Sequence, residues 1–152
     1  SGKCQAVLSI GKIPAAGELV EMPPVELAFY SLMAHRQCQG KGFVHRGDEG
    51  LDREFLAQYR QIHSDYAGEM ERIEAVLAAG MSVEYFDQRK SRVNTTLEEV
   101  LGPQLAAPYL IQAEGKRPRT RYGLRLEAAA IRFGAIEPAA SLRPHRDQTT
   151  QP

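Results

Sequence analysis

The chain has 152 residues, of which 43% are hydrophobic and 25% charged, as is usual for one globular domain. No apolar run approaches the roughly 20 residues of a membrane helix, and the N-terminus lacks the charged start and apolar core of a signal peptide. The net charge is zero, so the overall charge does not draw the chain toward nucleic acid. Two cysteines are too few for a disulfide framework, so we expect reduced thiols, a cytoplasmic location and no membrane partner.

The charges are distributed unevenly along the chain. Residues 1–88 hold 8 Lys/Arg and 13 Asp/Glu, a net charge of −5, whereas residues 89–152 hold 11 Lys/Arg and 6 Asp/Glu, a net charge of +5. Such asymmetry between halves indicates a side that faces a polyanion.

The first predicted elements are short strands. "CQAVLSI" (Cys4–Ile10) is β-prone, and "GELVEM" (Gly17–Met22) has Leu19 and Met22 as its apolar positions. Gly11, Pro14 and Gly17 punctuate the interval, so these segments predict an N-terminal β-hairpin or two short strands.

The next segment, "PPVELAFYSLMAHRQC", predicts an amphipathic helix from Pro23 to Cys38. Prolines suit a helix entry because their missing amide would be unpaired there. The apolar residues recur at helical spacing, at Val25, Ala28, Phe29, Leu32 and Met33. The glycine-rich stretch Gln39–Gly50 then predicts a mobile loop.

Residues 51–79 form the longest helical pattern. Its apolar positions step by three or four residues through Leu51, Phe55, Tyr59, Ile62, Tyr66, Met70, Ile73 and Leu77. The pattern fits either one long helix, which Gly68 could kink, or a broken pair of helices, and Gly80 is a natural stop. The stripe can bury against the domain or against a partner helix.

A last helix and a hairpin follow. Ser82 is a good N-cap, a break is expected near Lys90-Ser91, and Gly102-Pro103 should end the helix. Beyond it, "PYLIQAEG" and "RYGLRL" are β-like runs that "KRPRT" joins in a turn. Residues 137–152 have little to bury and predict a flexible tail behind a domain of residues 1–136.

This order of elements predicts an α+β fold. Two short strands, three helical segments and a C-terminal hairpin match a winged helix-turn-helix with an N-terminal β-hairpin, an inserted long helix and a hairpin wing.

Two resemblances agree with this fold. "EMPPVELAFYSLMA", "SRVNTTLEEVLG" and the hairpin that ends in "RYGLRL" resemble the winged-helix effector domain of two-component response regulators. In that family the wing closes on Gly-Tyr-Arg-Leu, whereas here it closes on Arg121-Tyr122-Gly123-Leu124, and the segment from 39 to 80 has no counterpart.

The chain from Leu8 to Phe133 also resembles the C-terminal domain of a CRISPR-associated family from type III systems. The residues that carry this resemblance are Met22–Ala34, Ser91–Gly102, Pro108–Ile111 and Arg121–Leu126. The resemblance implies antiviral defence, with an N-terminal ring-nuclease-type domain related to cyclic-oligoadenylate sensors as partner in cis or in trans. Any ring-nuclease activity it implies cannot be placed on residues of this chain.

The last helix and the hairpin turn hold the candidate binding residues. Arginine, lysine, hydroxyl and amide side chains contact phosphates and base edges when a recognition helix and a wing bind nucleic acid. The candidates for duplex DNA or RNA are Arg89, Lys90, Ser91, Arg92, Asn94, Thr95, Lys116, Arg117, Arg119 and Arg121. Glu98 and Glu99 would repel phosphate, which limits the usable face to the helix start.

Three alternatives stay open. The basic segment is an exposed face without a ligand, or the chain is an interaction module that forms a homodimer through residues 51–79. In the third alternative the chain is part of an enzyme that degrades a cyclic nucleotide, with its cations holding phosphates, although no catalytic group is visible for it.

Metal and catalytic sites are not expected. His35, Cys38 and His45, with Cys4 as a fourth ligand, match no standard zinc spacing. The acidic residues Asp48, Glu49, Asp52 and Glu54 favour a helix start over catalysis, because no supporting nucleophile or phosphate loop accompanies them. We therefore expect no metal, no cofactor and no catalytic residue.

Overall fold

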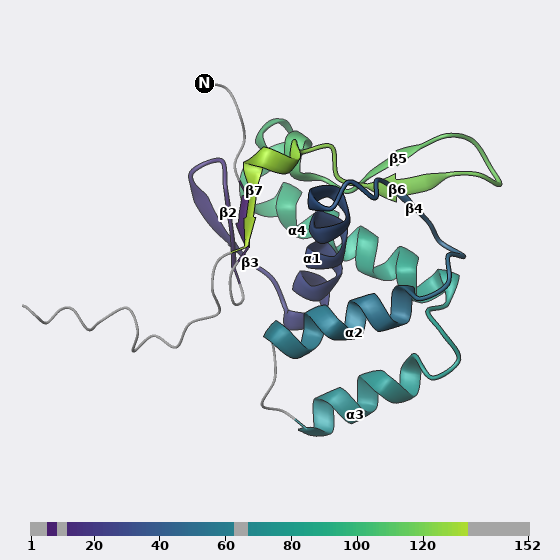
Figure 1. Cartoon of the computed structure of the whole chain (residues 1–152). Coiled ribbons are helices and arrows are strands. Elements are labelled where there is room, and N and C mark those ends of the chain that lie inside the picture. The colour runs from purple at the N-terminus through teal and green to yellow at the C-terminus, as the bar shows by residue number, and fades with distance from the viewer. Residues whose placement is uncertain (1–5, 9–11, 63–66, 134–152) are drawn as a thin grey trace, which may run out of the picture.

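A computed structural model describes residues 6–8, 12–62 and 67–133, and this part of the chain has the expected α+β class (Figure 1). Its helices are α1 (Pro24–Cys38), α2 (Leu51–Ile62), α3 (Ala67–Val76) and α4 (Val83–Ala106), with 3-10 turns at Ala107–Tyr109 and Ala128–Ala130. Its strands are β1 (Ala6–Leu8), β2 (Lys12–Ala15), β3 (Glu18–Glu21), β4 (Val44–His45), β5 (Gln112–Glu114), β6 (Arg121–Gly123) and β7 (Ile131–Phe133). The predicted tail, 137–152, lies outside the described residues.

Helix α1 is the centre of the core (Figure 1). All nine residues from Glu26 to Ala34 are buried, so the helix is enclosed and not merely packed along the predicted apolar face. The Phe29 and Phe86 rings meet edge to face, with 5.0 Å between centroids, and so join α1 to α4. The Tyr30 hydroxyl donates to the Tyr109 carbonyl oxygen at 2.9 Å, which ties α1 to the turn after α4.

The N-terminal hairpin lies later in the chain than its predicted position. β2 and β3 pair antiparallel around a turn at Ala16-Gly17, so the segment between the two predicted strands is itself a strand. Val20 is buried and Leu19 is 60% exposed, which reverses the predicted face at this position because neighbouring strand residues point to opposite sides. β1 lies within the predicted first strand, but its partner is β7, in a parallel pair.

Residues 51–79 form two separate helices, which is one of the two alternatives that the sequence left open. Leu51, Phe55 and Tyr59 are buried on α2, and Ile73 and Leu77 are buried in and after α3. Arg36 of α1 donates to both carboxylate oxygens of Glu54 at 3.0 and 2.9 Å, which fixes α2 against α1. The described part of the apolar stripe thus packs in or against the chain's own core, and Tyr66 lies outside the described residues.

Helix α4 begins directly after Ser82, as predicted, but does not break near Lys90-Ser91. Ser82 caps it as expected, because its hydroxyl accepts a hydrogen bond from the Tyr85 amide at 3.0 Å. The helical path is interrupted at Gly102, whose φ of 82° only glycine adopts easily, and Pro103 begins a further short turn. The regular helix therefore ends at Gly102, as predicted, and a short helical segment continues after the kink.

The C-terminal hairpin belongs to a three-stranded sheet. β5 and β6 pair antiparallel as predicted, and β4 pairs with the outer side of β6, giving the order β4-β6-β5. The loop predicted as mobile therefore contributes a strand. A Cβ atom on Gly123 would lie 2.5 Å from Cδ1 of Phe43, so only glycine lets the Phe43 ring close over β6.

Two buried tyrosines predict that the fold loses stability at alkaline pH. Burial and the 3.1 Å hydrogen bond to Glu69 raise the pKa of Tyr59 to about 12, and burial also raises the pKa of Tyr30. Between pH of about 10 and about 12 the unfolded chain ionises Tyr59 first, so the free energy of unfolding should fall over that window. Urea denaturation across this pH range measures the fall. Tyr59→Phe should flatten it, and an equally steep fall in that variant would assign the effect elsewhere.

Candidate nucleic-acid interface

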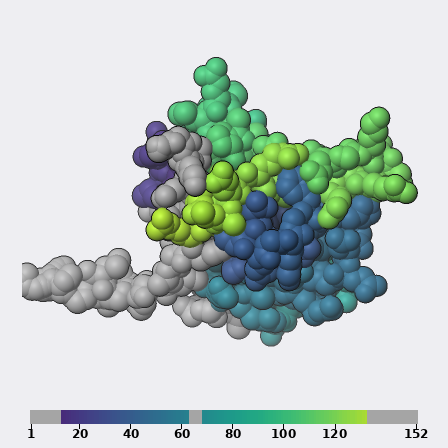
Figure 2. All heavy atoms as spheres, turned by 45° about the horizontal axis from the view of Figure 1, so that its top comes forward, coloured from purple at the N-terminus to yellow at the C-terminus, as the bar shows by residue number. Residues whose placement is uncertain are grey.

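The tip of the β5–β6 hairpin presents three of the predicted cations. Lys116, Arg117 and Arg119 are exposed in the turn, and the hairpin projects from the body of the molecule (Figure 2). Gly115 makes the turn: its φ is 82°, and a Cβ there would lie 3.1 Å from the Arg119 carbonyl oxygen. The Arg119 amide donates to the Lys116 carbonyl oxygen at 2.6 Å, so the turn is closed by its own backbone.

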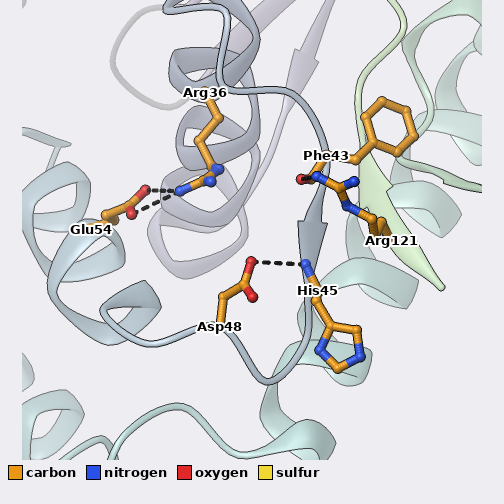
Figure 3. A network of polar contacts seen from close by, with 6 residues as sticks. All are labelled: Arg36, Phe43, His45, Asp48, Glu54 and Arg121. Carbon is orange, nitrogen blue, oxygen red and sulfur yellow. Dashed lines mark hydrogen bonds and ion pairs between the residues drawn. The ribbon is translucent and has the colours of Figure 1, made fainter. Parts of the chain in front are cut away.

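The base of the hairpin is held by the loop between α1 and α2 (Figure 3). Arg121 donates from Nη2 to the Phe43 carbonyl oxygen at 3.0 Å, and the Asp48 carboxylate accepts from the His45 amide at 3.0 Å. The Gly47 amide donates to Nδ1 of His45 at 3.0 Å, so the ring proton resides on Nε2 and is donated to the Pro118 carbonyl oxygen at 2.7 Å. This network fixes how the basic tip is presented.

A hollow of about 600 Å³ lies along this hairpin. The residues that line it are His45, Glu114, Gly115, Pro118, Arg119 and Arg121. The carboxylate of Glu114 lies 3.5 Å from Nη2 of Arg125, so its negative charge has a partner. The two arginines of this lining suit an anionic group such as a phosphodiester.

The α4 part of the predicted surface divides into an exposed ridge and two packed sides. Ser91, Arg92 and Thr95 are exposed, whereas Phe86, Val93 and Leu97 are fully buried. Lys90 places its Nζ 5.0 Å from the centroid of the Tyr122 ring, so it lies against β6 as a half-buried cation.

Arg89 does not belong to the exposed surface. Its Nη1 lies 3.4 Å from Oε2 of Glu26, and the two side chains are 11% and 5% exposed. Its guanidinium also covers the Tyr85 ring at 4.7 Å from the centroid. Arg89 therefore joins α4 to α1 inside the protein, and we remove it from the set of predicted nucleic-acid contacts.

Asn94 is engaged by the backbone of the chain. Its Oδ1 accepts from the Ile111 amide at 2.9 Å, and its Nδ2 donates to the Ile111 carbonyl oxygen at 3.0 Å. The Asn94 side chain thereby pairs with the backbone of Ile111 in the way that a neighbouring strand would. It is unavailable to bases or phosphates, and we remove Asn94 from the predicted contacts as well.

Acidic residues on α4 reduce the part of the predicted surface that can bind phosphate. Glu84, Glu98 and Glu99 are exposed on α4, and the last two lie on the C-terminal side of Thr95, where the sequence placed them. Arg46 approaches Asp87 of α4, with 2.7 Å between Nη1 and Oδ2, and so balances the charge of this acid. The usable cations are therefore those of the hairpin, together with Lys90 and Arg92.

His45 and Arg125 are parts of this site that the sequence did not reveal. Arg125 is exposed and lies over the Phe43 ring at 5.1 Å from its centroid, beside the hairpin. The sequence marks His45 only as a candidate metal ligand, because it lies in a glycine-rich stretch and no local pattern indicates its contact with Pro118. A contact across 73 positions leaves no local signal.

In residues 6–8, 12–62 and 67–133, no three His, Cys, Asp or Glu side chains form a group that could hold a metal ion. Burial raises the pKa of the Cys38 thiol, which makes it a poor nucleophile, and Cys4 lies outside the described residues. In the acidic segment, Glu54 pairs with Arg36, and Asp52 lies in the first turn of α2.

Comparisons with known proteins add no relative: no protein family, curated protein or solved structure matches the chain. Within the described residues, no helix combines the length and the apolar character that crossing a membrane requires.

Proposed function

We propose that the chain is a winged-helix module that binds nucleic acid through the hairpin tip and the exposed ridge of α4. The observation that carries the proposal is the sheet order β4-β6-β5. In a winged helix the strand after the first helix pairs with the last strand, so the hairpin lies beside the helix that approaches the ligand. The same order places Tyr122 of β6 under Lys90 of α4.

Charge supports the same surface. Lys116, Arg117 and Arg119 are exposed at the tip, and Arg92 is exposed on the ridge. Cations that neutralise phosphates release counterions, so about four such contacts give a plot of log Kobs against log salt with a slope of about −3.6. Arg121 would add donors at the base of the hairpin, where its hydrogen bond to the Phe43 carbonyl oxygen already fixes its position.

The resemblance to the CRISPR-associated family extends the proposal. The segments Met22–Ala34 and Ser91–Gly102 that carry it form α1 and the part of α4 that includes the exposed ridge. We place the module next to a cyclic-oligoadenylate sensor domain of a type III system, where bound nucleic acid would regulate that domain. The dimer alternative has less support, because the stripe it needs is buried in the core.

Neutralising the hairpin tip is the direct test. The double variant Lys116→Gln/Arg117→Gln should lower affinity for a duplex at least about tenfold at low salt and reduce the magnitude of the salt slope by about 2. Fluorescence anisotropy at about 50 mM and about 200 mM salt measures both quantities.

The matched control is Arg72→Gln on α3, where an exposed arginine is 3.8 Å from Glu69. It also removes positive charge and should leave the affinity and the slope unchanged. Equal losses in the control and the tip variant would show a nonspecific charge effect and refute the proposed surface.

A further inference from the structure

A second hollow, of about 260 Å³, lies between the start of α1 and the exposed ridge of α4. It is lined by Pro23, Glu26, Ser91, Arg92, Thr95 and Thr96. No residue of the hairpin lines it, so it is distinct from the basic hollow described above. Its volume lies near the lower end of small-molecule sites and suits a ligand of the size of one nucleotide unit.

One side of this hollow suits an anionic group. Arg92 supplies a guanidinium, and Ser91, Thr95 and Thr96 supply three hydroxyl groups from successive turns of α4. The opposite wall is the start of α1, where the first amides of a helix have no acceptor within the helix. Pro24 has no amide N–H and Pro23 gives no side-chain cap, so the amides of Val25 and Glu26, with the positive end of the helix dipole, favour an acceptor at this wall.

The other side of the hollow requires a hydrogen-bond donor. Glu26 is a carboxylate whose side chain is only 5% exposed, and it forms part of the lining. Arg89 balances its charge from 3.4 Å, at the Oε2 atom. A carboxylate only accepts hydrogen bonds, so a hydroxyl or N–H group that settles against Glu26 in this hollow would be stabilised, whereas a second anion would be repelled.

The ligand must bring an anionic group for Arg92 and a hydrogen-bond donor for Glu26. A phosphate alone would meet Arg92 but would bring a second negative charge toward Glu26. A ribose phosphate brings an anion for Arg92 and hydroxyl donors for Glu26, as carboxylates accept from ribose hydroxyls in nucleotide sites. The sugar inside a DNA strand has no free hydroxyl, so the 2′-hydroxyl is the group that would distinguish the two nucleic acids.

The position of the hollow is compatible with a strand that also reaches the hairpin. On α4, Lys90 and Asn94 face the hairpin side, whereas Arg89 faces α1. With 3.6 residues per turn, Ser91 and Thr95 lie on the ridge between these two sides. A strand that crosses this ridge passes from the hairpin base to the hollow.

We infer that this hollow binds one ribose phosphate unit and that the module consequently prefers RNA to DNA. The preference for RNA within a strand rests on the proposed function, whereas recognition of the ribose phosphate itself does not require the hairpin. A free ribonucleotide and an RNA strand offer the same chemistry, and the experiment separates them.

The test compares RNA and DNA single strands of one sequence by fluorescence anisotropy on the full chain. It includes a ribonucleoside monophosphate and its 2′-deoxy counterpart in an NMR titration. One satisfied charged acceptor predicts about tenfold tighter binding of the RNA strand. Glu26→Gln removes the charged acceptor assigned to the 2′-hydroxyl and should bring the RNA-to-DNA affinity ratio close to one, whereas Thr95→Val/Ser91→Ala removes hydroxyls assigned to the phosphate and should weaken both strands.

The control is Lys116→Gln, which should weaken RNA and DNA equally because it lies at the hairpin tip. Equal affinity of the unaltered chain for RNA and DNA overturns the inference and leaves the proposed function intact. A preference for RNA that survives in a folded Glu26→Gln variant also overturns it. If neither strand binds but the ribonucleotide binds more tightly than its deoxy counterpart, the proposed function fails and the ribose phosphate site stands; if none of these ligands binds, both fail.

Discussion

Replacement of Arg89 by methionine is expected to lower the free energy of unfolding by about 3–5 kcal/mol, the usual cost of removing one partner of a buried ion pair. The Glu26 carboxylate would stay 5% exposed and would lose the only cation that lies within ion-pair distance of it in the described structure. Methionine preserves much of the length of the arginine side chain, so the loss reports charge and not a large cavity. Urea denaturation of the two proteins measures it.

Two further variants make this result interpretable. Arg92→Met removes an exposed arginine three positions along the same helix and should change the free energy of unfolding by less than about 0.5 kcal/mol. Glu26→Gln added to Arg89→Met removes the unbalanced charge and should recover a large part of the lost stability. If Arg89→Met is as stable as Arg92→Met, the buried pair does not hold α1 and α4 together.

Replacement of Asn94 by alanine is expected to cost about 2–3 kcal/mol and to loosen the entry to β5. Both hydrogen bonds with Ile111 would be lost, and the amide and carbonyl of a buried residue would remain without these partners. The loss can be measured by denaturation together with amide hydrogen exchange at Ile111. Protection of that amide should fall more than protection within α1.

The neighbouring residue provides the control for this prediction. Thr95→Ala changes an exposed side chain on the same turn, so it should leave the free energy of unfolding within about 0.5 kcal/mol of the unaltered chain. A variant Asn94→Ala that keeps both its stability and its Ile111 protection would show that the side chain does not position β5. In that case Asn94 would return to the set of predicted ligand contacts.

The sequence predicted the elements whose signals are local. The spacing of apolar residues identified α1, the hydroxyl of Ser82 identified the start of α4, and Gly102 identified its kink. The β5–β6 hairpin was predicted from two β-like runs around Pro118. Each of these signals lies within a few residues of the feature that it specifies.

Features that depend on distant residues were missed. β4 has only two residues, and its partner Tyr122 lies far along the chain, so no alternation could reveal it. Val20 and not Leu19 is buried because the hairpin register, set by the turn at Ala16-Gly17, decides which side faces the core.

The candidate site shows the same limit. Seven of the ten predicted residues are exposed: Ser91, Arg92, Thr95, Lys116, Arg117, Arg119 and Arg121. Arg89 and Asn94 carry the same chemistry, but their partners Glu26 and Ile111 lie on other elements and use that chemistry internally. Residue type indicated what each side chain can bind, whereas packing decided which of them are available.

The parallel pairing of β1 with β7 has a mechanical consequence. Ala6 lies opposite Ile131 and Leu8 opposite Phe133, so the two outermost described strands run side by side in the same direction. A tension applied at Ala6 and at Phe133 would act at opposite ends of this short ladder. It would therefore load the hydrogen bonds together, in shear, and would not open them one at a time. The β1–β7 pair would therefore resist a pulling force on either strand and protect the core from it.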